Sequence, residues 1–425
     1  SQSPSCLTPD SPALLLRNRL NAFLLALALL LPTAPALWAQ PGQDDPGWVT
    51  TWSASPSTLP PAREQEFVQL ENQTLRLIVR TSAGGEALRL RISNTHGTRP
   101  LVVGGVSVAT QVFVSNVLGI PGMSSKAVTF SAAASFTIPV GAVMISDPVE
   151  FAVPQTGNLA VSIYLPEASG FLTSHRAALQ TNFISAPGNF LSGDFVVAEE
   201  ITYSSLLTAV DVVTSAPART IVALGDSITD GTGSTDSANQ RWPDHFTQRL
   251  YADGSLPDYS VVIAAIAGNR VTTQASPIFG ENLQARFERD VLALSNVSHI
   301  ILLEGINDIG MSSRLPPLIS AGEIINGYRQ IIARAHARGI KVYASTLLPY
   351  EGAVYYTEEG NAVRLEVNEF IRNSGEFDAV IEFEKVVADP ANPNRLRAEF
   401  TQDNLHPNDA GYEAMAEVIP LELFR

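Results

Sequence analysis

The segment Thr220–Gly231, TIVALGDSITDG, decides the fold of the second half of this sequence. Its apolar run Ile221–Leu224 is short and ends at a glycine, which is typical of a strand buried on both faces of a parallel sheet. A serine, Ser227, follows directly after the strand. Because functional groups in open α/β sheets gather at the carboxyl ends of the strands, Ser227 is the first candidate site residue.

From this segment to the end of the chain, apolar strands alternate with amphipathic segments of helix length. Strands are predicted at residues 220–224, 260–265, 299–303, 341–346 and 379–382. Helices are predicted at residues 242–252, 283–295, 321–338, 361–373 and 410–423. Such alternation is typical of a doubly wound parallel sheet, and it predicts an α/β domain over residues 219–425.

The part before this domain has a different periodicity. Residues 46–215 contain short β-type runs separated by Gly, Pro and Asn, for example at residues 74–81, 87–93 and 159–165. In Leu88–Ile92, apolar and charged residues alternate, as in a half-buried antiparallel strand. We therefore predict an all-β sandwich domain over residues 46–215, with a linker at residues 212–218.

The first 39 residues resemble neither part. Arg17 and Arg19 precede the apolar run Leu20–Leu31, and small residues lead to Ala39. About twelve apolar residues are too few for a helix that spans a membrane, which needs roughly twenty. We therefore predict a signal peptide or leader over residues 1–39, although a membrane anchor is the alternative. The mature protein is expected to be secreted or periplasmic, without stable membrane insertion.

Charge and cysteine content exclude several function classes. The formal net charge of −15 argues against nucleic acid as a partner, because binding its phosphates needs a basic face. Cys6, the one cysteine, lies in the predicted leader, so the mature protein would have no thiolate to act as a nucleophile or metal ligand. The oligomeric state cannot be predicted from these features.

A serine hydroxyl needs a base to take its proton, and the base needs a third group that fixes its tautomer. Of the six histidines, only His406 follows an acidic residue by three positions, in Asp403-Asn404-Leu405-His406. Residues three apart in a tight turn can project to the same side. We therefore expect the Asp403 carboxylate to accept from Nδ1 of His406 while Nε2 faces Ser227.

Acyl transfer also needs hydrogen-bond donors for the oxyanion that forms on the carbonyl oxygen. Gly268 follows the second predicted strand of the sheet, and Asn307 follows the third. Together with the backbone N–H of Ser227, these two residues would give an oxyanion hole with three donors.

In this order, Gly225-Asp226-Ser227, Gly268, Gly305-x-Asn307 and Asp403-x-x-His406 resemble the four motifs of the SGNH (GDSL) hydrolase family. The resemblance covers residues 219–425 and implies a flavodoxin-like sheet and the activity of an esterase, lipase or acyl hydrolase. It also implies that Ser227 is nucleophile and donor, that Gly268 and Asn307 complete the oxyanion hole, that His406 is the base and that Asp403 orients it.

The first half is similar, less specifically, to the N-terminal region of secreted two-domain family members grouped with xylan-cluster acyl and aryl esterases. The likeness rests on Thr51–Pro56, Gln73–Arg76 and Arg91–Asn94. It implies an acylated plant polysaccharide as the substrate. We expect hydrolysis of short-chain carboxylic esters through an acyl-enzyme. The alternatives are a lipase or lysophospholipase, and a glycan-binding protein with a vestigial hydrolase domain.

Neither a metal nor an organic cofactor is expected. Asp226, Asp230 and Asp308 follow strands of the sheet, but each can have an ordinary role in a turn or at a strand end, and no second histidine is spaced to join them. The glycines after Ser227 lack the lysine and the spacing of a nucleotide-binding loop. Residues 272–282 and 349–359 are expected to line the site. Trp48, Trp52 and Trp242 are interpreted as core residues rather than as sugar platforms.

Overall fold

The computed structural model describes residues 47–57, 69–111, 125–214, 218–255, 258–274 and 277–425. Residues 46–425 form one compact unit, so the division into two domains stays a prediction. The predicted signal peptide lies outside the described residues. Within the ranges just given, none of the helices combines the length and the hydrophobicity that a membrane-spanning segment needs.

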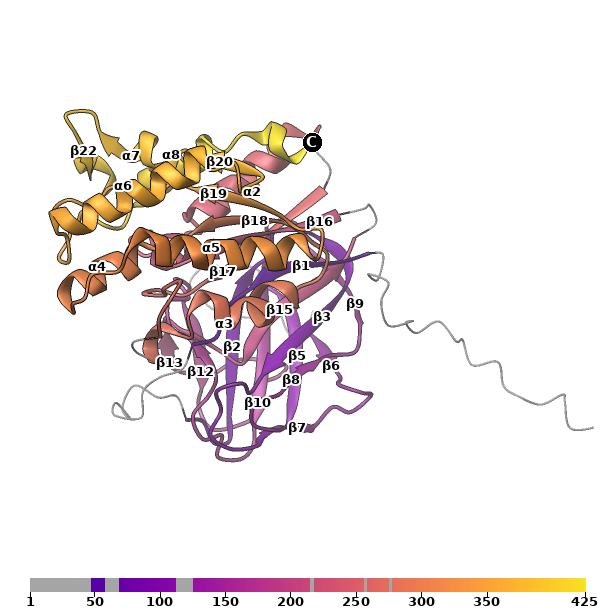
Figure 1. The fold of residues 1–425 in the computed structure, drawn as a ribbon. Coiled ribbons are helices and arrows are strands. Elements are labelled where there is room, and N and C mark those ends of the chain that lie inside the picture. Colours follow the sequence, from indigo (N-terminus) through magenta and orange to yellow (C-terminus); the bar gives the residue numbers. More distant parts are fainter. Residues whose placement is uncertain (1–46, 58–68, 112–124, 215–217, 256–257, 275–276) are drawn as a thin grey trace, which may run out of the picture. The chain divides into compact units, whose positions relative to one another are not determined.

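The N-terminal part is an antiparallel all-β structure, drawn in indigo to magenta (Figure 1). One sheet has the order β1 (Trp48–Ser53), β15 (Leu207–Val213), β3 (Gly85–Ser93), β8 (Val143–Ile145), with β9 (Val149–Val153) also paired to β3. The second has the order β13 (Val197–Ile201), β12 (Asn182–Ser185), β2 (Gln73–Arg80), β10 (Asn158–Leu165), β5 (Gly105–Thr110), β6 (Lys126–Val128). Two short pairs are β4 (Leu101–Val103) with β7 (Phe136–Ile138), and β11 (Ser174–His175) with β14 (Ser204–Ser205).

The alternation in β3 places its apolar residues in the core between the sheets. Leu88, Leu90 and Ile92 are completely buried, as the sequence predicts. The other face of β3 is not open to solvent at its end, however. Arg91 is only 9% exposed and donates to the carbonyl of Ala293 in the C-terminal part. The half-buried strand is thus covered on both faces where the two parts of the chain meet.

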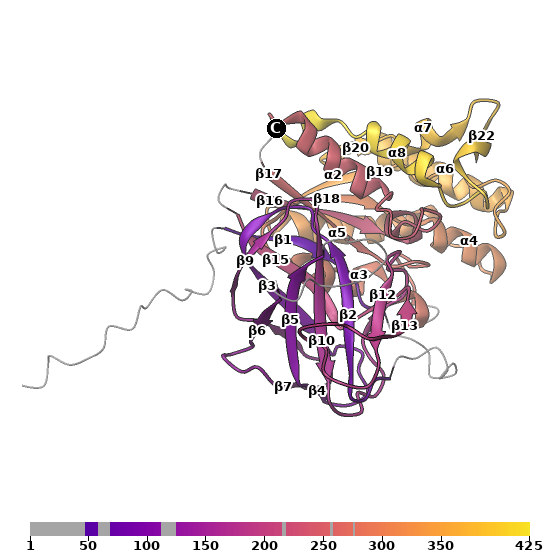
Figure 2. The same ribbon diagram turned by 180° about the vertical axis from the view of Figure 1, so that it is seen from behind.

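The C-terminal part is a five-stranded parallel sheet with helices on both faces (Figure 2). Its strand order is β17 (Asp258–Ala265), β16 (Ala218–Gly225), β18 (Val297–Leu303), β19 (Lys341–Ser345), β20 (Ala379–Ile381). Numbered from β16, this is the order 2-1-3-4-5 of flavodoxin-like folds. The chain reverses its direction of travel between β16 and β18, so the carboxyl end of β16 lies at the point where such folds bind ligands.

The helices agree with the amphipathic segments of the sequence, with two corrections. The described helices are α1 (Ser227–Asp230), α2 (Trp242–Asp253), α3 (Leu283–Phe287), α4 (Ile306–Arg314), α5 (Ala321–His336), α6 (Glu358–Asn373), α7 (Phe383–Val387) and α8 (Asp409–Glu417). The helix predicted at 283–295 is wrong in its second half, where α3 passes into a π-helical turn at Glu288–Leu292. The helix predicted at 410–423 ends early, before a 3₁₀ turn at Leu421–Phe424.

Several elements were not predicted. The sequence did not indicate α1, α4, α7 or the hairpin β21 (Ala388–Asp389)–β22 (Asn392–Leu396). The predicted linker is also too long, because Val212 and Val213 belong to β15 and Ala218 begins β16. Residues 215–217 lie outside the described residues.

Candidate active site

Ser227 lies at the first position of α1, directly beyond the carboxyl end of β16. Asp226 caps the helix, and its Oδ1 accepts from the N–H of Ile228 at 3.0 Å. Gly225 allows this sharp strand-to-helix turn, since a Cβ there would lie 2.4 Å from the carbonyl oxygen of Leu303. The N–H of Ser227 belongs to the first helical turn, whose amides have no acceptor within the helix. Hydroxyl and N–H therefore sit together at the end of the strand.

The structure brings Ser227, His406 and Asp403 together, although 179 residues separate the serine from the histidine. Oγ of Ser227 lies 2.8 Å from Nε2 of His406, and Nδ1 of His406 lies 2.7 Å from Oδ2 of Asp403. The other carboxylate oxygen, Oδ1, accepts from the N–H of Leu405 at 2.9 Å and of His406 at 2.8 Å. Asn408 caps α8 immediately afterwards. The His406 turn is thereby held from both ends.

The electrostatics of Asp403 suit a group that orients an imidazole. Burial would raise the pKa of this carboxyl. The hydrogen bonds from the His406 ring and from the backbone N–H groups of His406 and Leu405 outweigh burial and hold the pKa well below its usual range. Asp403 is therefore ionised at neutral pH, and it favours the tautomer of His406 that carries its proton on Nδ1.

The two other predicted donors lie at the ends of the strands on either side of β16. Gly268 follows β17 with φ of 81°, and a Cβ there would lie 2.2 Å from the ring of Phe279. Asn307 lies in the first turn of α4, after β18. Its Nδ2 donates to the carbonyl of Asn269 at 3.1 Å, and its Oδ1 accepts from the hydroxyl of Tyr355 at 3.2 Å. An amide nitrogen has two hydrogens, so one remains for a ligand.

Phe279 and Tyr355 come from the two loops predicted to line the site. Each contacts a predicted donor: the Phe279 ring packs on Gly268, and the Tyr355 hydroxyl holds Asn307. Residues 275 and 276 of the first loop lie outside the described residues. The two loops therefore orient the candidate donors at the same time as they flank them.

Three carboxyl groups and one guanidinium are buried beneath these residues. Burial raises the pKa of Asp226 to about 7 and raises that of Glu304 well above its usual range. Burial also raises the pKa of Asp308, which accepts from the N–H groups of Val271 and Thr272. In the part of the chain that the structure describes, no group of three or more His, Cys, Asp or Glu side chains is arranged to hold a metal ion.

Arg286 of α3 is the cation of this buried layer, and no pattern in the sequence indicated it. Its side chain is completely buried and lies 3.3 Å from Glu304. It donates to the carbonyls of Gly225 and Ala264 at 3.0 and 2.9 Å, and to Oδ1 of Asn269 at 2.7 Å. One side chain therefore joins the carboxyl end of β16, the end of β17 and the loop that carries Gly268.

Comparison with known families agrees with this geometry. Residues 223–414, slightly less than half of the chain, match the model of the GDSL-like Lipase/Acylhydrolase family. This part of the chain is a GDSL-like lipase/acylhydrolase domain. The match includes Ser227, Gly268, Asn307, Asp403 and His406, and the family consists of ester hydrolases. No curated protein matches the chain.

Solved structures similar to the chain include three that each match slightly less than half of it. A putative lipolytic protein of the G-D-S-L family from Desulfitobacterium hafniense is 21% identical, with a TM-score of 0.36; the match covers 47% of this chain and 96% of that protein. An acetyl xylan esterase, AlAXEase, is 23% identical, with a TM-score of 0.39; the match covers 47% of this chain and 97% of that protein. A variant of an acetyl xylan esterase from Geobacillus stearothermophilus is 19% identical, with a TM-score of 0.38 and coverage of 48% and 93%.

One side chain of the β-structure contacts the GDSL domain, and this contact was not predicted from the sequence. His175 of β11 lies 3.1 Å from Oδ1 of Asp230, the last residue of α1. Asp230 makes a strand-end hydrogen bond, as predicted, because its Oδ2 accepts from the N–H of Ala267 at 3.2 Å, but its pairing with His175 was not predicted. His175 lies 55 residues before Asp230 and in another sheet, so spacing along the sequence could not reveal the pair. Asp226 and Asp308 do bond to turn amides, as predicted.

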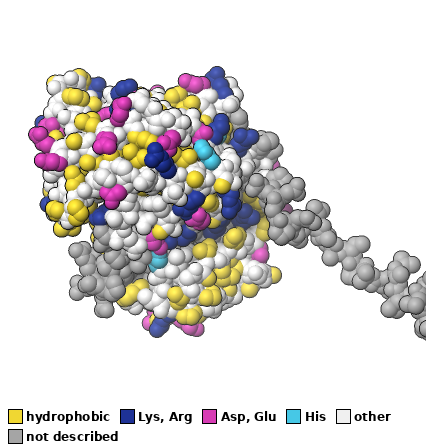
Figure 3. All heavy atoms as spheres, viewed as in Figure 1, with side chains coloured by type: hydrophobic (Ala, Val, Ile, Leu, Met, Phe, Trp, Pro, Cys, Tyr) yellow, Lys and Arg dark blue, Asp and Glu magenta, His cyan; other side chains and the backbone are white. Residues whose placement is uncertain are grey.

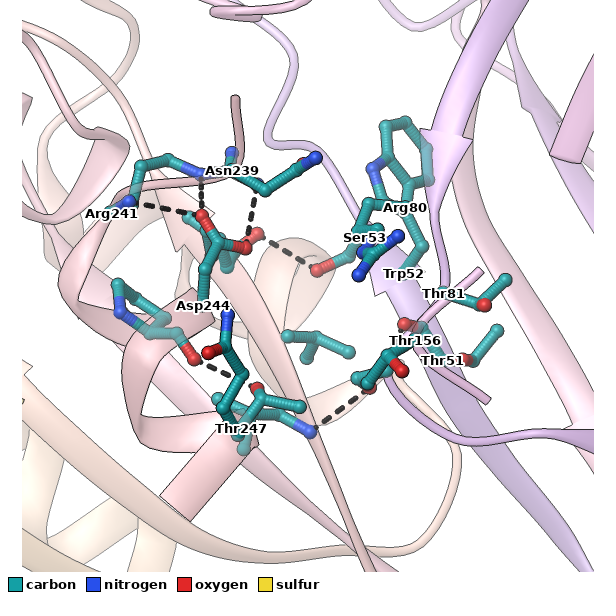
Figure 4. Close-up of a pocket in the computed structure, with 16 residues that line it drawn as sticks. Thr51, Trp52, Ser53, Arg80, Thr81, Thr156, Asn239, Arg241, Asp244 and Thr247 are labelled. Atoms are coloured by element: carbon teal, nitrogen blue, oxygen red, sulfur yellow. Dashed lines mark hydrogen bonds and ion pairs between the residues drawn. The ribbon is translucent and has the colours of Figure 1, made fainter. Parts of the chain in front are cut away.

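A groove lies beside this pair, between the β-structure and the GDSL domain. Figure 4 shows Trp52 and Arg80 on one wall and Asn239, Arg241 and Asp244 on the other. A second pocket adjoins it, shares Trp52, Arg80, Asn239 and Arg241, and extends to Asp230. Arg241 is paired with Asp244 at 2.7 Å, whereas the guanidinium of Arg80 has no hydrogen-bond or ion-pair partner among the described residues.

The tryptophans differ in their environment. Trp242 is completely buried and Trp48 is 8% exposed, so both are core residues, as predicted. Trp52 is only partly buried: it packs against the core of the β-structure, which confirms the prediction in part, and it also lines both pockets. The groove therefore has an aromatic ring beside polar side chains.

Proposed function

We propose that the protein is a serine esterase in which Ser227, His406 and Asp403 form the catalytic triad. One observation carries this proposal: the continuous chain of hydrogen bonds from Oγ of Ser227 through His406 to Asp403, with distances of 2.8 and 2.7 Å. The membership of residues 223–414 in an ester-hydrolase family supports it.

The reaction follows from this arrangement. Nε2 of His406 takes the hydroxyl proton as Oγ of Ser227 attacks the ester carbonyl. The negative charge that forms on the carbonyl oxygen is stabilised by the N–H groups of Ser227 and Gly268 and by Nδ2 of Asn307. The His406 imidazolium then gives its proton to the departing alcohol, and the acyl group stays on Ser227. A water molecule, activated by His406 in the same way, releases the carboxylic acid.

The test is the hydrolysis of p-nitrophenyl acetate by the purified protein and its Ser227→Ala variant, at neutral pH and with a chelator present. We expect activity in the wild type that the variant lacks, and complete inhibition of the wild type by a serine-directed phosphonate. Equal activity in both proteins would mean that another residue is the nucleophile. Inactivity of both would favour the alternative of a glycan-binding protein with a vestigial hydrolase domain.

We propose a carbohydrate that carries short acyl groups as the substrate. Support comes from the groove, because a partly exposed tryptophan beside Arg80, Asn239 and Asp244 offers a platform for a sugar ring and hydrogen bonds for its hydroxyls. Trp52→Ala should lower kcat/KM on acetylated xylan relative to kcat/KM on p-nitrophenyl acetate, by about 2- to 10-fold. An unchanged ratio would contradict the role of the groove. Faster turnover of long-chain than of acetyl esters would favour a lipase or lysophospholipase.

We also propose that the protein is exported, on the strength of Arg17, Arg19 and the apolar run Leu20–Leu31. The described surface does not favour nucleic acid as a partner. The net charge is −15, and on the face shown in Figure 3 acidic and basic side chains lie interspersed. Fractionation of cells that express the full chain, followed by N-terminal sequencing, tests export. An uncleaved protein in the cytosolic fraction would contradict it.

A further inference from the structure

Hydrogen bonding determines the protonation state of His175. Its Nδ1 lies 2.8 Å from the carbonyl oxygen of Ser55. Its Nε2 lies 3.1 Å from Oδ1 of Asp230 and 3.2 Å from the carbonyl oxygen of Ala177. All three partners are oxygen acceptors, and a neutral imidazole has only one N–H. Protons on both ring nitrogens satisfy all three acceptors, so this geometry favours the imidazolium form of His175.

Asp230 connects this cation to both parts of the candidate active site. It ends α1, the helix that begins with Ser227, and it is 1% exposed. Its Oδ1 pairs with His175, while its Oδ2 accepts from the N–H of Ala267 at 3.2 Å. Ala267 directly precedes Gly268. One carboxylate therefore joins the helix of the nucleophile to the loop of a candidate oxyanion donor.

We infer that His175 is a positioning residue for ester hydrolysis: its ring holds the Asp230 carboxylate in place through their ion pair, and Asp230 in turn holds Gly268 in register with Ser227. This inference rests on the proposed function. The N-terminal β-structure thereby contributes to the catalytic geometry from a distance, although His175 contacts neither Ser227 nor His406 in any hydrogen bond of the described structure. Removal of the imidazolium would leave Asp230 as an unpaired buried charge, which is costly.

The charge on His175 depends on pH. Burial works to lower its pKa, but the charge of Asp230 and the hydrogen bonds to Asp230, Ser55 and Ala177 outweigh burial, so the pKa is raised. The other charged groups along the adjoining pocket are Arg80 of β2 and Arg241 before α2, the latter paired with Asp244.

Because the pKa of His175 is higher in the folded than in the unfolded protein, its protonation stabilises the fold. This stabilisation is complete at pH values below the unfolded-state pKa of about 6.5, and it is lost as the pH rises through the folded-state pKa. Above that value one ring nitrogen would face an oxygen acceptor without a proton. We therefore expect kcat to decline on the alkaline side as His175 is deprotonated.

The experiment compares His175→Gln with wild type on p-nitrophenyl acetate, followed by titration of the released acid from about pH 6 to about pH 9. His336→Gln is the matched control, because His336 also pairs with an aspartate, Asp378, at a distance of 2.8 Å, but on the exposed surface. We expect His175→Gln to lower kcat about 10- to 100-fold, with KM little changed and without the alkaline decline. The control should stay within about twofold of wild type at every pH.

A folded His175→Gln variant whose kcat stays within about twofold of wild type, or whose alkaline decline is unchanged, would overturn the inference. If that variant does not fold, Asp230→Asn replaces it. The amide oxygen of Asn can still accept from Ala267, but without the negative charge the alkaline decline should move to lower pH. A decline at the same pH would also overturn the inference. Retained activity of Ser227→Ala would instead reject the proposed function itself, so the two failures are distinguishable.

Discussion

Gly268→Ala changes the candidate oxyanion hole by a single methyl group, and the structure indicates where the strain would go. A Cβ at this position would lie 2.2, 2.6 and 2.7 Å from three ring atoms of Phe279, well inside van der Waals contact. The φ of 81° adds a cost of about 1–2 kcal/mol for a residue with a side chain. The main chain that carries the ring is itself held, because the carbonyl of Phe279 accepts from Nδ2 of Asn269 at 2.7 Å.

The loop that carries Gly268 must therefore shift, and its N–H would no longer point at the developing oxyanion. Loss of one such donor lowers kcat by about 10²–10³-fold, or about 2.7–4 kcal/mol of transition-state stabilisation. We expect this loss for Gly268→Ala on p-nitrophenyl acetate, with a much smaller change in KM, because the donor acts on charge that exists only in the transition state.

Gly339→Ala is the matched control for this prediction. Gly339 follows α5 with φ of 71°, but a Cβ there would meet no atom within 4 Å. It carries similar backbone strain without the clash, so we expect a loss of about 1 kcal/mol in the free energy of unfolding and an unchanged kcat. The reasoning is refuted if Gly268→Ala keeps kcat within about threefold of wild type, or if both variants lose kcat equally.

Two further predictions concern Asp403 of the proposed triad and the core histidine His299. Asp403→Asn keeps an acceptor for the N–H groups of Leu405 and His406 but loses the carboxylate that pairs with Nδ1 of His406. We expect kcat to fall about 10³–10⁴-fold while the melting temperature changes little. A fall in kcat of less than about tenfold would contradict the proposed role of Asp403. Burial lowers the pKa of His299 to about 4, so the free energy of unfolding should fall as pH drops from about 6.5 to about 4. His299→Phe, measured by denaturant unfolding at the two pH values, should show a smaller fall than wild type; an equal fall would mean that other groups cause it.

The sequence was sufficient for the architecture because each strand of the parallel sheet is a short buried apolar run. Ile221–Leu224 is completely buried on both faces, and such a run has no polar alternation that could be mistaken for an exposed strand. The order of these runs, with helices between them, left few topologies open. Ser227, Gly268 and Asn307 could be placed because each follows the end of a predicted strand.

The helices that were not predicted lack an amphipathic pattern of apolar and polar residues over several turns. In α4, every residue from Ile306 to Gly310 is buried, polar residues included, so the segment lacks the apolar stripe that indicates a surface helix. The helix α1 has four residues and depends on its Asp226 cap. Both helices begin directly after a strand end. There, tertiary contacts around the site determine the backbone conformation, and helix propensity has little influence.

His175 and Arg286 were missed for another reason. Each is defined by a partner far away in the sequence, and neither has a spacing motif around it. The ring of His175 pairs with a residue 55 positions later, and Arg286 donates to the carbonyl of Gly225, 61 positions earlier. Local periodicity carries no information about such pairs. Asp403 and His406 could be predicted because their contact spans a single turn.

The role inferred for His175 requires that the β-structure keep one fixed orientation toward the GDSL domain, and a buried charge network at their junction provides the means. Asp211 of β15 is completely buried and accepts from Arg91, Thr50 and Ser295 at 2.9, 2.7 and 2.9 Å. Burial would raise its pKa, but Arg91, Thr50 and Arg89 hold the pKa below its usual range. Since Ser295 belongs to the GDSL domain, a small rotation at the junction would break its hydrogen bonds to Asp211 and Thr50, whereas Arg91 would stay paired with Asp211 inside the β-structure. Directional hydrogen bonds of this kind favour one orientation of the β-structure toward the GDSL domain, whereas purely apolar contacts would allow the two surfaces to shift against each other. A junction that only tethered a binding module would not need this precision, whereas the placement of Asp230 by His175 does.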